Sequence, residues 1–196
     1  MFVKICGLTS PEATRAAITA GADAVGFVFA ESPRQISPER AAELCADVPG
    51  NVVRVAVMRH PTAAEWEAVR DDFAPDWLQT DAGDLDELEL STGCEPLPVY
   101  RTGQMAQAAT PRRLLYEGKD SGRGELADWR EAGALAAESE LILAGGLSPE
   151  NVVAAIAAVS PWGVDVSSGV EYEPGRKDPE KIEDFIARAR AAETES

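Results

Sequence analysis

The chain has 196 residues, 45% of them hydrophobic, and its 34 acidic residues outnumber its 18 lysines and arginines, giving a net charge of −16. This length and apolar content predict a single domain, residues 1–196, with one sizeable core. The negative charge argues against binding to nucleic acid or to an anionic membrane, and no segment approaches the ~20 apolar residues that a membrane span requires.

The cysteine and lysine contents indicate a cellular setting. Cys6, Cys45 and Cys94 lie far apart with no CxxC pairing, which favours a reducing cytoplasm over a disulfide framework. The first residues lack the basic and apolar regions of a signal peptide, so we expect a cytoplasmic protein. Lysine occurs at only four positions, and with so acidic a surface we expect a halophilic protein, the alternative being an ordinary acidic one. The single histidine, His60, leaves little scope for a histidine-based metal site, and we expect no metal.

Short β-rich runs alternate with amphipathic helical segments along the chain. The eight predicted strands are Phe2–Cys6, Ala24–Phe29, Val52–Val57, Trp77–Gln79, Leu97–Arg101, Arg113–Tyr116, Leu141–Ala144 and Gly163–Val166. Helix starts repeat one device, a capping side chain followed by proline, at Ser10-Pro11, Ser37-Pro38, Ser148-Pro149 and Asp178-Pro179. This order predicts an α/β fold, a single (β/α)8 TIM barrel. The stretch TGQMAQAATP leaves room for at most a short helix, so helix 5 should be shortened or absent.

A doubly wound open sheet is the competing architecture. It would place a glycine-rich GxGxxG turn after the first strand, where this chain reads CGLTSPE. The barrel is therefore favoured, and barrels carry their functional residues at the C-terminal ends of the strands.

The first predicted strand ends on a cysteine. Alternation along the strand puts Phe2, Lys4 and Cys6 on one face, so Lys4 points into the barrel and needs a counter-ion. A lone cysteine is most often a small buried hydrophobic residue. Its position above an inward lysine favours a chemical role for Cys6.

Two further strand ends carry charged candidates. Arg34 follows the second strand, and its guanidinium suits a carboxylate or phosphate, although a lone arginine is ordinarily a solvated surface residue. Glu117 ends the sixth strand on the same face as Leu115 and precedes a loop containing three glycines that could order over a ligand. The alternative for Glu117 is a surface glutamate in a flexible loop.

The last two strands are each followed by a turn of small residues. Gly145-Gly146 lets the backbone approach a ligand closely, and Ser168-Gly169 follows a strand on which Asp165 and Ser167 share a face. These two loops are the usual phosphate site of a TIM barrel, where backbone N–H groups hold the anion. They predict a phosphorylated small-molecule substrate.

Taken together, the motifs KICGLTSPEA, GADAVGFVFAESPRQIS, LILAGGLSPENV, VDVSSGVE and PGRKD resemble those of the phosphoribosylanthranilate isomerase family of tryptophan biosynthesis. The resemblance implies a phosphate-binding barrel that needs no metal or organic cofactor and acts as a monomer or homodimer. It implies an aldose–ketose isomerase, an intramolecular oxidoreductase. The reaction would be the Amadori rearrangement of N-(5-phosphoribosyl)anthranilate to 1-(2-carboxyphenylamino)-1-deoxyribulose 5-phosphate.

The resemblance also implies roles for individual residues. Cys6 matches the general base, and Glu117, counted back from Asp128-Trp129, falls where the family has its general-acid aspartate. Arg34 would contact the anthranilate end of the substrate, and Asp165 would also contact the substrate. The phosphate loops correspond to Gly145, Gly146, Ser168 and Gly169.

The chain departs from the family's pattern at three places. Glu117 is one methylene longer than the aspartate, the QLHG motif of the fourth strand reads QTDA, and the GGTG loop reads SGRG. Asp120, in that last loop, is the competing candidate for the acid. These departures leave two alternatives, a related barrel isomerase acting on another aminated sugar phosphate and a homologue that binds a ligand without converting it.

Overall fold

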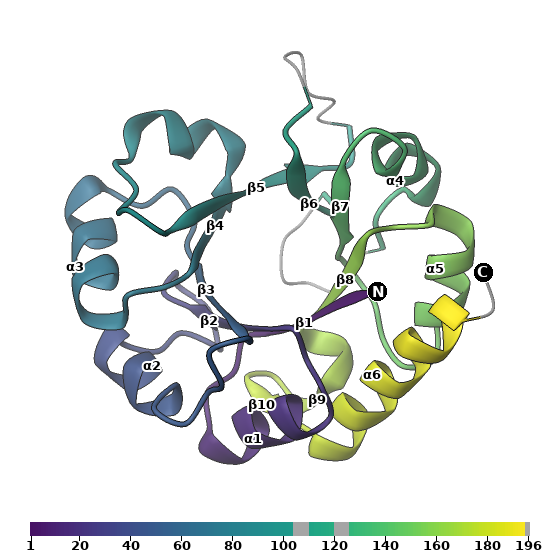
Figure 1. The fold of residues 1–196 in the computed structure, drawn as a ribbon, viewed down its shortest axis with the longest axis horizontal. Helices are drawn as coiled ribbons and strands as arrows, with labels where there is room; N and C mark the ends of the chain where they lie inside the picture. The colour runs from purple at the N-terminus through teal and green to yellow at the C-terminus, as the bar shows by residue number, and fades with distance from the viewer. Residues whose placement is uncertain (104–109, 120–125, 195–196) are drawn as a thin grey trace.

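The computed structural model describes residues 1–103, 110–119 and 126–194. Eight parallel strands form a closed barrel in chain order, and β1 pairs with β8 to close it (Figure 1). The strands are β1 (Phe2–Cys6), β2 (Ala24–Val28), β3 (Val53–Val57), β4 (Trp77–Asp81), β5 (Glu95–Arg101), β6 (Arg113–Glu117), β7 (Glu140–Leu143) and β8 (Gly163–Val166). The predicted (β/α)8 barrel is confirmed.

Helices cover the outside of the barrel (Figure 1). They are α1 (Pro11–Thr19), α2 (Pro38–Leu44), α3 (Ala63–Phe73), α4 (Trp129–Ala136), α5 (Val152–Val159) and α6 (Pro179–Thr194). After β4 the chain forms only a 3₁₀ helix, η1 (Ala82–Glu87), so this connection also accounts for the short chain. The predicted shortening of helix 5 concerns residues 104–109, which lie outside the described residues.

Three of the four predicted helix starts are confirmed. The hydroxyls of Ser10 and Ser37 accept hydrogen bonds from the first turns of α1 and α2, and Asp178 does the same for α6. The prediction at Ser148-Pro149 was wrong, because α5 begins only at Val152. The Ser148 carbonyl first accepts N–H groups of the following turn, which delays the helix by one turn.

The barrel interior is filled from the strands, as alternation requires. Val3 and Ile5 of β1 belong to the outer core against the helices, whereas the inner core gathers inward side chains of the other strands. At the N-terminal end, Phe2 stacks on Trp162 with ring centroids 4.6 Å apart, and the Arg113 guanidinium lies 4.3 Å from the Trp77 ring centroid. Stacked rings and a cation–π contact therefore fill this end of the barrel.

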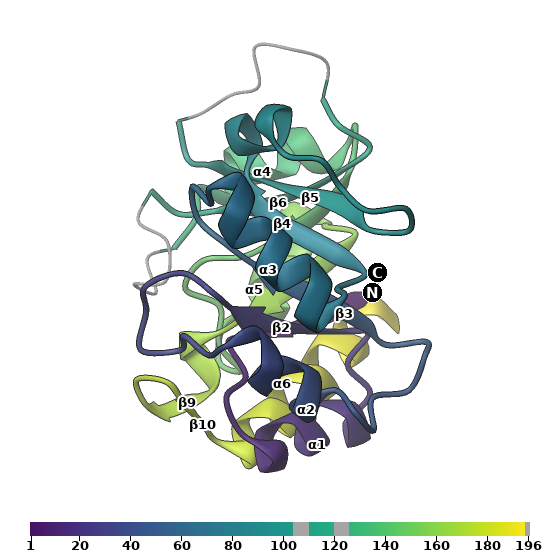
Figure 2. The same cartoon turned by 90° about the vertical axis from the view of Figure 1, so that its left-hand side faces the viewer.

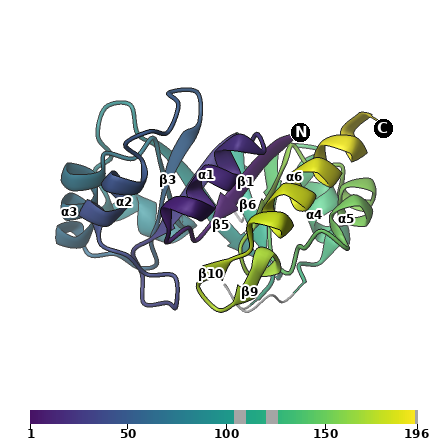
Figure 3. The same ribbon diagram turned by 90° about the horizontal axis from the view of Figure 1, so that it is seen from below.

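A second small sheet marks the opposite end. Strands β9 (Glu171–Glu173) and β10 (Arg176–Lys177) form an antiparallel hairpin after the 3₁₀ helix η2 (Ser168–Val170). Figures 2 and 3 show this hairpin and the N-terminus at opposite ends of the barrel. The hairpin thus lies at the C-terminal ends of the strands, where TIM barrels carry their sites. Among the described helices, none is long and apolar enough to cross a membrane.

Candidate active site

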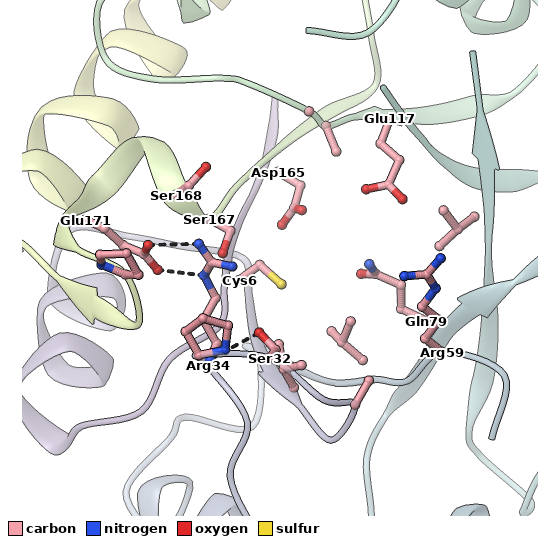
Figure 4. Close-up of a pocket in the computed structure, with 18 of the residues that line it drawn as sticks. Cys6, Ser32, Arg34, Arg59, Gln79, Glu117, Asp165, Ser167, Ser168 and Glu171 are labelled. Atoms are coloured by element: carbon pink, nitrogen blue, oxygen red, sulfur yellow. Dashed lines mark hydrogen bonds and ion pairs between the residues drawn. The ribbon is translucent and has the colours of Figure 1, made fainter. Parts of the chain in front are cut away.

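A cavity of about 820 Å³ opens at the C-terminal ends of the strands (Figure 4). Its wall includes seven of the eight residues predicted as site residues: Cys6, Arg34, Glu117, Gly145, Gly146, Asp165 and Ser168. The eighth, Gly169, instead packs against the backbone of the loop after β7. The structure therefore brings together, from five different strand ends, residues that are up to 162 positions apart in the chain.

Cys6 lies beside a buried ion pair. Lys4 Nζ donates to Asp165 Oδ1 at 2.8 Å, and the two residues are register partners on β1 and β8. Gly26 of β2 leaves room for this group, since a Cβ there would lie 3.2 Å from both Cys6 Sγ and Lys4 Nζ. The counter-ion that an inward lysine requires is thus Asp165.

Burial dominates the protonation of the thiol. It raises the pKa of Cys6; the Lys4 charge lowers it in part, while Asp165 adds to the rise. Burial alone would lower the pKa of Lys4, but its attraction to the Asp165 carboxylate outweighs this and raises it. The unliganded site therefore holds a neutral thiol next to a charged lysine, and Lys4 alone does not make Cys6 a thiolate.

Arg34 is fixed by a carboxylate that the sequence did not single out. Its Nε and Nη2 donate to Glu171 at 2.7 and 2.8 Å, in a bidentate pair (Figure 4). Gly7, with φ of 71°, makes space for it, because a Cβ there would lie 2.5 Å from Arg34 Cδ. The glycine after Cys6 thus admits the Arg34 side chain to the cavity wall.

Lys177 completes this cluster from the hairpin. Its buried ammonium donates to Glu171 Oε1 at 2.7 Å and to the carbonyl and hydroxyl of Ser167 at 3.0 and 3.1 Å. Burial lowers the pKa of Lys177 despite its bond to Glu171. Lys177 and Glu171 tie the hairpin to the loop after β8. Their signals in the sequence were the motifs that contain them: Glu171 ends VDVSSGVE, and Lys177 stands in PGRKD of a lysine-poor chain.

Glu117 lies on the opposite wall from Arg34 (Figure 4). Its Oε1 is 3.2 Å from Arg101 Nε, and Arg101 also pairs with Asp81. Sequence reasoning missed Arg101, although it ends a predicted strand. Nearby, Gln79 Oε1 is buried in the cavity wall without a hydrogen-bond partner in the described part of the chain, so it offers an acceptor to a ligand.

The two predicted phosphate turns have the backbone that such turns need. Gly145 and Gly146 have φ of 83° and 63°, a region that favours glycine, and Asn151 Nδ2 donates to the Gly146 carbonyl at 2.8 Å. A Cβ on Gly169 would lie 1.9 Å from the Leu147 carbonyl oxygen. The loops after β7 and β8 are therefore packed directly against one another.

Fold and cavity together define a TIM-barrel enzyme whose polar groups converge at the C-terminal ends of its strands. Comparison with known proteins narrows this class. The family model for N-(5'-phosphoribosyl)anthranilate (PRA) isomerase matches residues 3–188. The N-(5'-phosphoribosyl)anthranilate isomerase of Streptococcus pneumoniae is 37% identical over 190 residues, which is 96% of this chain and 95% of the relative.

Solved structures agree. Phosphoribosyl anthranilate isomerase from Thermotoga maritima superposes with a TM-score of 0.85 at 32% identity, covering 97% of this chain and 99% of that one. A phosphoribosyl anthranilate isomerase in complex with reduced 1-(o-carboxyphenylamino)-1-deoxyribulose 5-phosphate superposes at 0.80, with 32% identity and the same coverage. The chain belongs to the N-(5'-phosphoribosyl)anthranilate isomerase family, and it is an isomerase.

Proposed function

We propose that the barrel performs the Amadori rearrangement of N-(5-phosphoribosyl)anthranilate, a step of tryptophan biosynthesis, with Cys6 as general base and Glu117 as general acid. The observation that supports these roles is the cavity itself, to whose wall β1 contributes a thiol and β6 a carboxyl. The reaction needs one acid and one base on different sides of the ligand. It requires no metal and no organic cofactor.

The proton balance closes with these two groups. The Glu117 carboxyl gives its proton to the ring oxygen, the C1–O bond breaks, and the sugar opens to a Schiff base. Cys6, as a thiolate, then removes the proton from C2 to give an enolamine. The enolamine takes up a proton at C1 from the Cys6 thiol and returns the proton of its C2 hydroxyl to Glu117, which gives the ketose and restores both groups. The anionic substrate and the Lys4 charge next to Cys6 are the features that govern when the thiol ionises.

The substrate's two ends fit the two sides of the cavity. We assign the phosphate to the loops after β7 and β8, where Gly145, Gly146, Ser168 and Gly169 lie, and the anthranilate end to Arg34. The relative that holds a phosphorylated product analogue supports a phosphorylated small-molecule substrate for this chain. Asp165, paired with Lys4, would contact the sugar between the two ends.

Gly169→Ala tests the phosphate assignment. The new methyl group would meet the Leu147 carbonyl oxygen, so the two loops must separate, and we expect KM to rise at least about tenfold, the equivalent of about 1.4 kcal/mol. Steady-state kinetics measure this. Gly50→Ala is the matched control, because a Cβ there has no described neighbour within 4 Å. An unchanged KM in Gly169→Ala would remove the phosphate from this loop.

The charge of −16 carries the proposal that the protein is halophilic. Repulsion between exposed charges extends over a Debye length of ~10 Å at 0.1 M salt but only ~3 Å at 1 M. We therefore expect the fold to need molar salt and the melting temperature to fall on dialysis into low-salt buffer. Circular dichroism measures both. Neutralising two exposed acids, Glu138→Gln with Glu183→Gln, should lower the salt requirement. A native spectrum and an unchanged melting temperature at low salt would contradict the proposal.

The cysteines and one relative support a proposal for the compartment and the oligomeric state of the enzyme. All three cysteines are free and buried, as suits a reducing cytoplasm. The Thermotoga maritima relative is described as dimeric, and we propose a monomer or homodimer that acts on its small-molecule substrate without nucleic acid or membrane.

The activity is tested by forming the labile substrate in situ and following the loss of its anthranilate fluorescence. Turnover by the purified chain, with none on other aminated phosphosugars, is the expected result. Preferred turnover of another phosphosugar would favour the related isomerase. Tight substrate binding without conversion would favour a non-catalytic homologue.

A further inference from the structure

Three consecutive strands end on charged residues of alternating sign. Asp81 is the last residue of β4, Arg101 of β5 and Glu117 of β6. Arg101 and Glu117 are register partners, while Asp81 is aligned with Val99, two residues before Arg101. All three charged side chains line the cavity, and each is only 13–14% exposed.

Arg101 joins the two carboxylates. Its Nη1 forms an ion pair with Asp81 Oδ1, and its Nε lies 3.2 Å from Glu117 Oε1, so one guanidinium bridges β4 and β6. Asp81 is held on its other side by His60, whose Nε2 is 3.2 Å from Asp81 Oδ2. His60 in turn contacts Asp84 through Nδ1 at 2.9 Å. The network therefore runs from an exposed imidazole to the proposed catalytic acid.

This arrangement bears directly on the acid chemistry. A cation beside a carboxyl favours its ionised form, and a nearby carboxylate favours its protonated form. Both effects act on Glu117, because its neighbouring cation, Arg101, also pairs with the Asp81 carboxylate. A general acid has to hold its proton until the ring oxygen takes it, so the division of Arg101 between the two carboxylates matters for the reaction.

We propose that Arg101 and Asp81 are positioning residues for Glu117. Arg101 holds the Glu117 carboxyl at the cavity wall, and Asp81, by competing for the guanidinium, leaves that carboxyl able to take up the proton that it delivers. The inference rests on the proposed role of Glu117 as the acid. It also explains how a longer side chain serves here, since the guanidinium of the neighbouring strand fixes where the extra methylene places the carboxyl.

Other charged groups also face the cavity and set the background for any pH effect. They are Arg34 and Glu31 after β2, Arg59 after β3, Asp165 of β8, and Glu171 and Glu173 of the hairpin, with Cys6 on β1. Three of these charges are already paired, Asp165 with Lys4 and Arg34 with Glu171. Arg101 is the cation in contact with Glu117 among the described ion pairs.

The test is the pH dependence of the single-turnover rate, whose alkaline limb reports the deprotonation of the acid. Arg101→Gln removes the cation, and we expect this limb to move up by about one pH unit or more while the maximal rate falls at least about tenfold through lost positioning. Asp81→Asn removes the competitor, and we expect the same limb to move down. Arg101→Lys keeps the charge and should hold the limb near its wild-type pH.

Glu95→Gln is the matched control, a neutralised carboxylate at the other end of β5 that pairs with Arg113 and should leave the profile unchanged. Melting curves establish that each variant is folded, and Asp81→Asn alone decides the question if Arg101→Gln does not fold. If the alkaline limbs of Arg101→Gln and Asp81→Asn do not move, or move in the same direction, the inference is overturned. An inactive Glu117→Gln would in that case still support Glu117 as the acid. A fully active Glu117→Gln would overturn the acid assignment itself.

Discussion

Cys6→Ser is expected to lower kcat at least about 100-fold, the scale of losing a general base, with little change in substrate binding. Serine keeps the size and shape of the side chain next to Lys4 and Asp165, but its hydroxyl is almost never ionised near neutrality. Cys6 itself is buried and has a raised pKa, so its thiolate is scarce in the unliganded site. Single-turnover and steady-state kinetics on the same preparations separate the chemical step from binding.

Cys45 and Cys94 provide the matched controls for this experiment. Both thiols are buried outside the cavity, and burial raises their pKa values to about 12 and about 11, so neither is a reactive group. Their serine variants should turn over at the wild-type rate once folded. A Cys6→Ser enzyme with near-normal kcat would return Cys6 to the role of a small core residue.

Glu117→Gln is expected to have the second large effect, a fall in kcat of at least about 100-fold with binding largely kept. Glutamine preserves the shape of the side chain but has no acidic proton to give to the ring oxygen. Glu117→Asp keeps the acid but withdraws it by one methylene from Arg101, which lies 3.2 Å away in the native chain. We expect partial activity from this variant.

Asp120 is the alternative acid, three positions after Glu117 and outside the described residues. Asp120→Asn is therefore measured beside Glu117→Gln in the same assay. Normal turnover in Glu117→Gln together with an inactive Asp120→Asn would transfer the acid role to Asp120.

The sequence predicted the barrel well because its signals are local. Alternation and apolar runs marked all eight strands to within two residues at either end, and the caps at Ser10 and Ser37 marked helix starts directly. The start of α5 was missed because Ser148 uses its carbonyl for a preceding turn, which the dipeptide Ser-Pro does not distinguish from a cap.

The candidate site was predictable where single residues end strands, as with Cys6 and Glu117. It was not predictable where function depends on pairing between elements. The bidentate hold of Glu171 on Arg34 and the bridge through Arg101 need the register and side-chain directions of strands that are distant in sequence. Residue type alone does not distinguish Glu171 and Arg101 from the many charged surface residues of an acidic chain.

The ion pair between Lys4 and Asp165 has a consequence for how the enzyme matures during synthesis. The two residues are 161 positions apart, so a ribosome has to release almost the whole barrel before the surroundings of Cys6 exist. Partial chains that lack β8 carry Cys6 and Lys4 without Asp165, so the thiol lacks the buried ion pair beside which it lies in the complete barrel. In a variant whose single cysteine is Cys6, the loss of its reaction with a thiol reagent would therefore time the moment at which β8 joins β1.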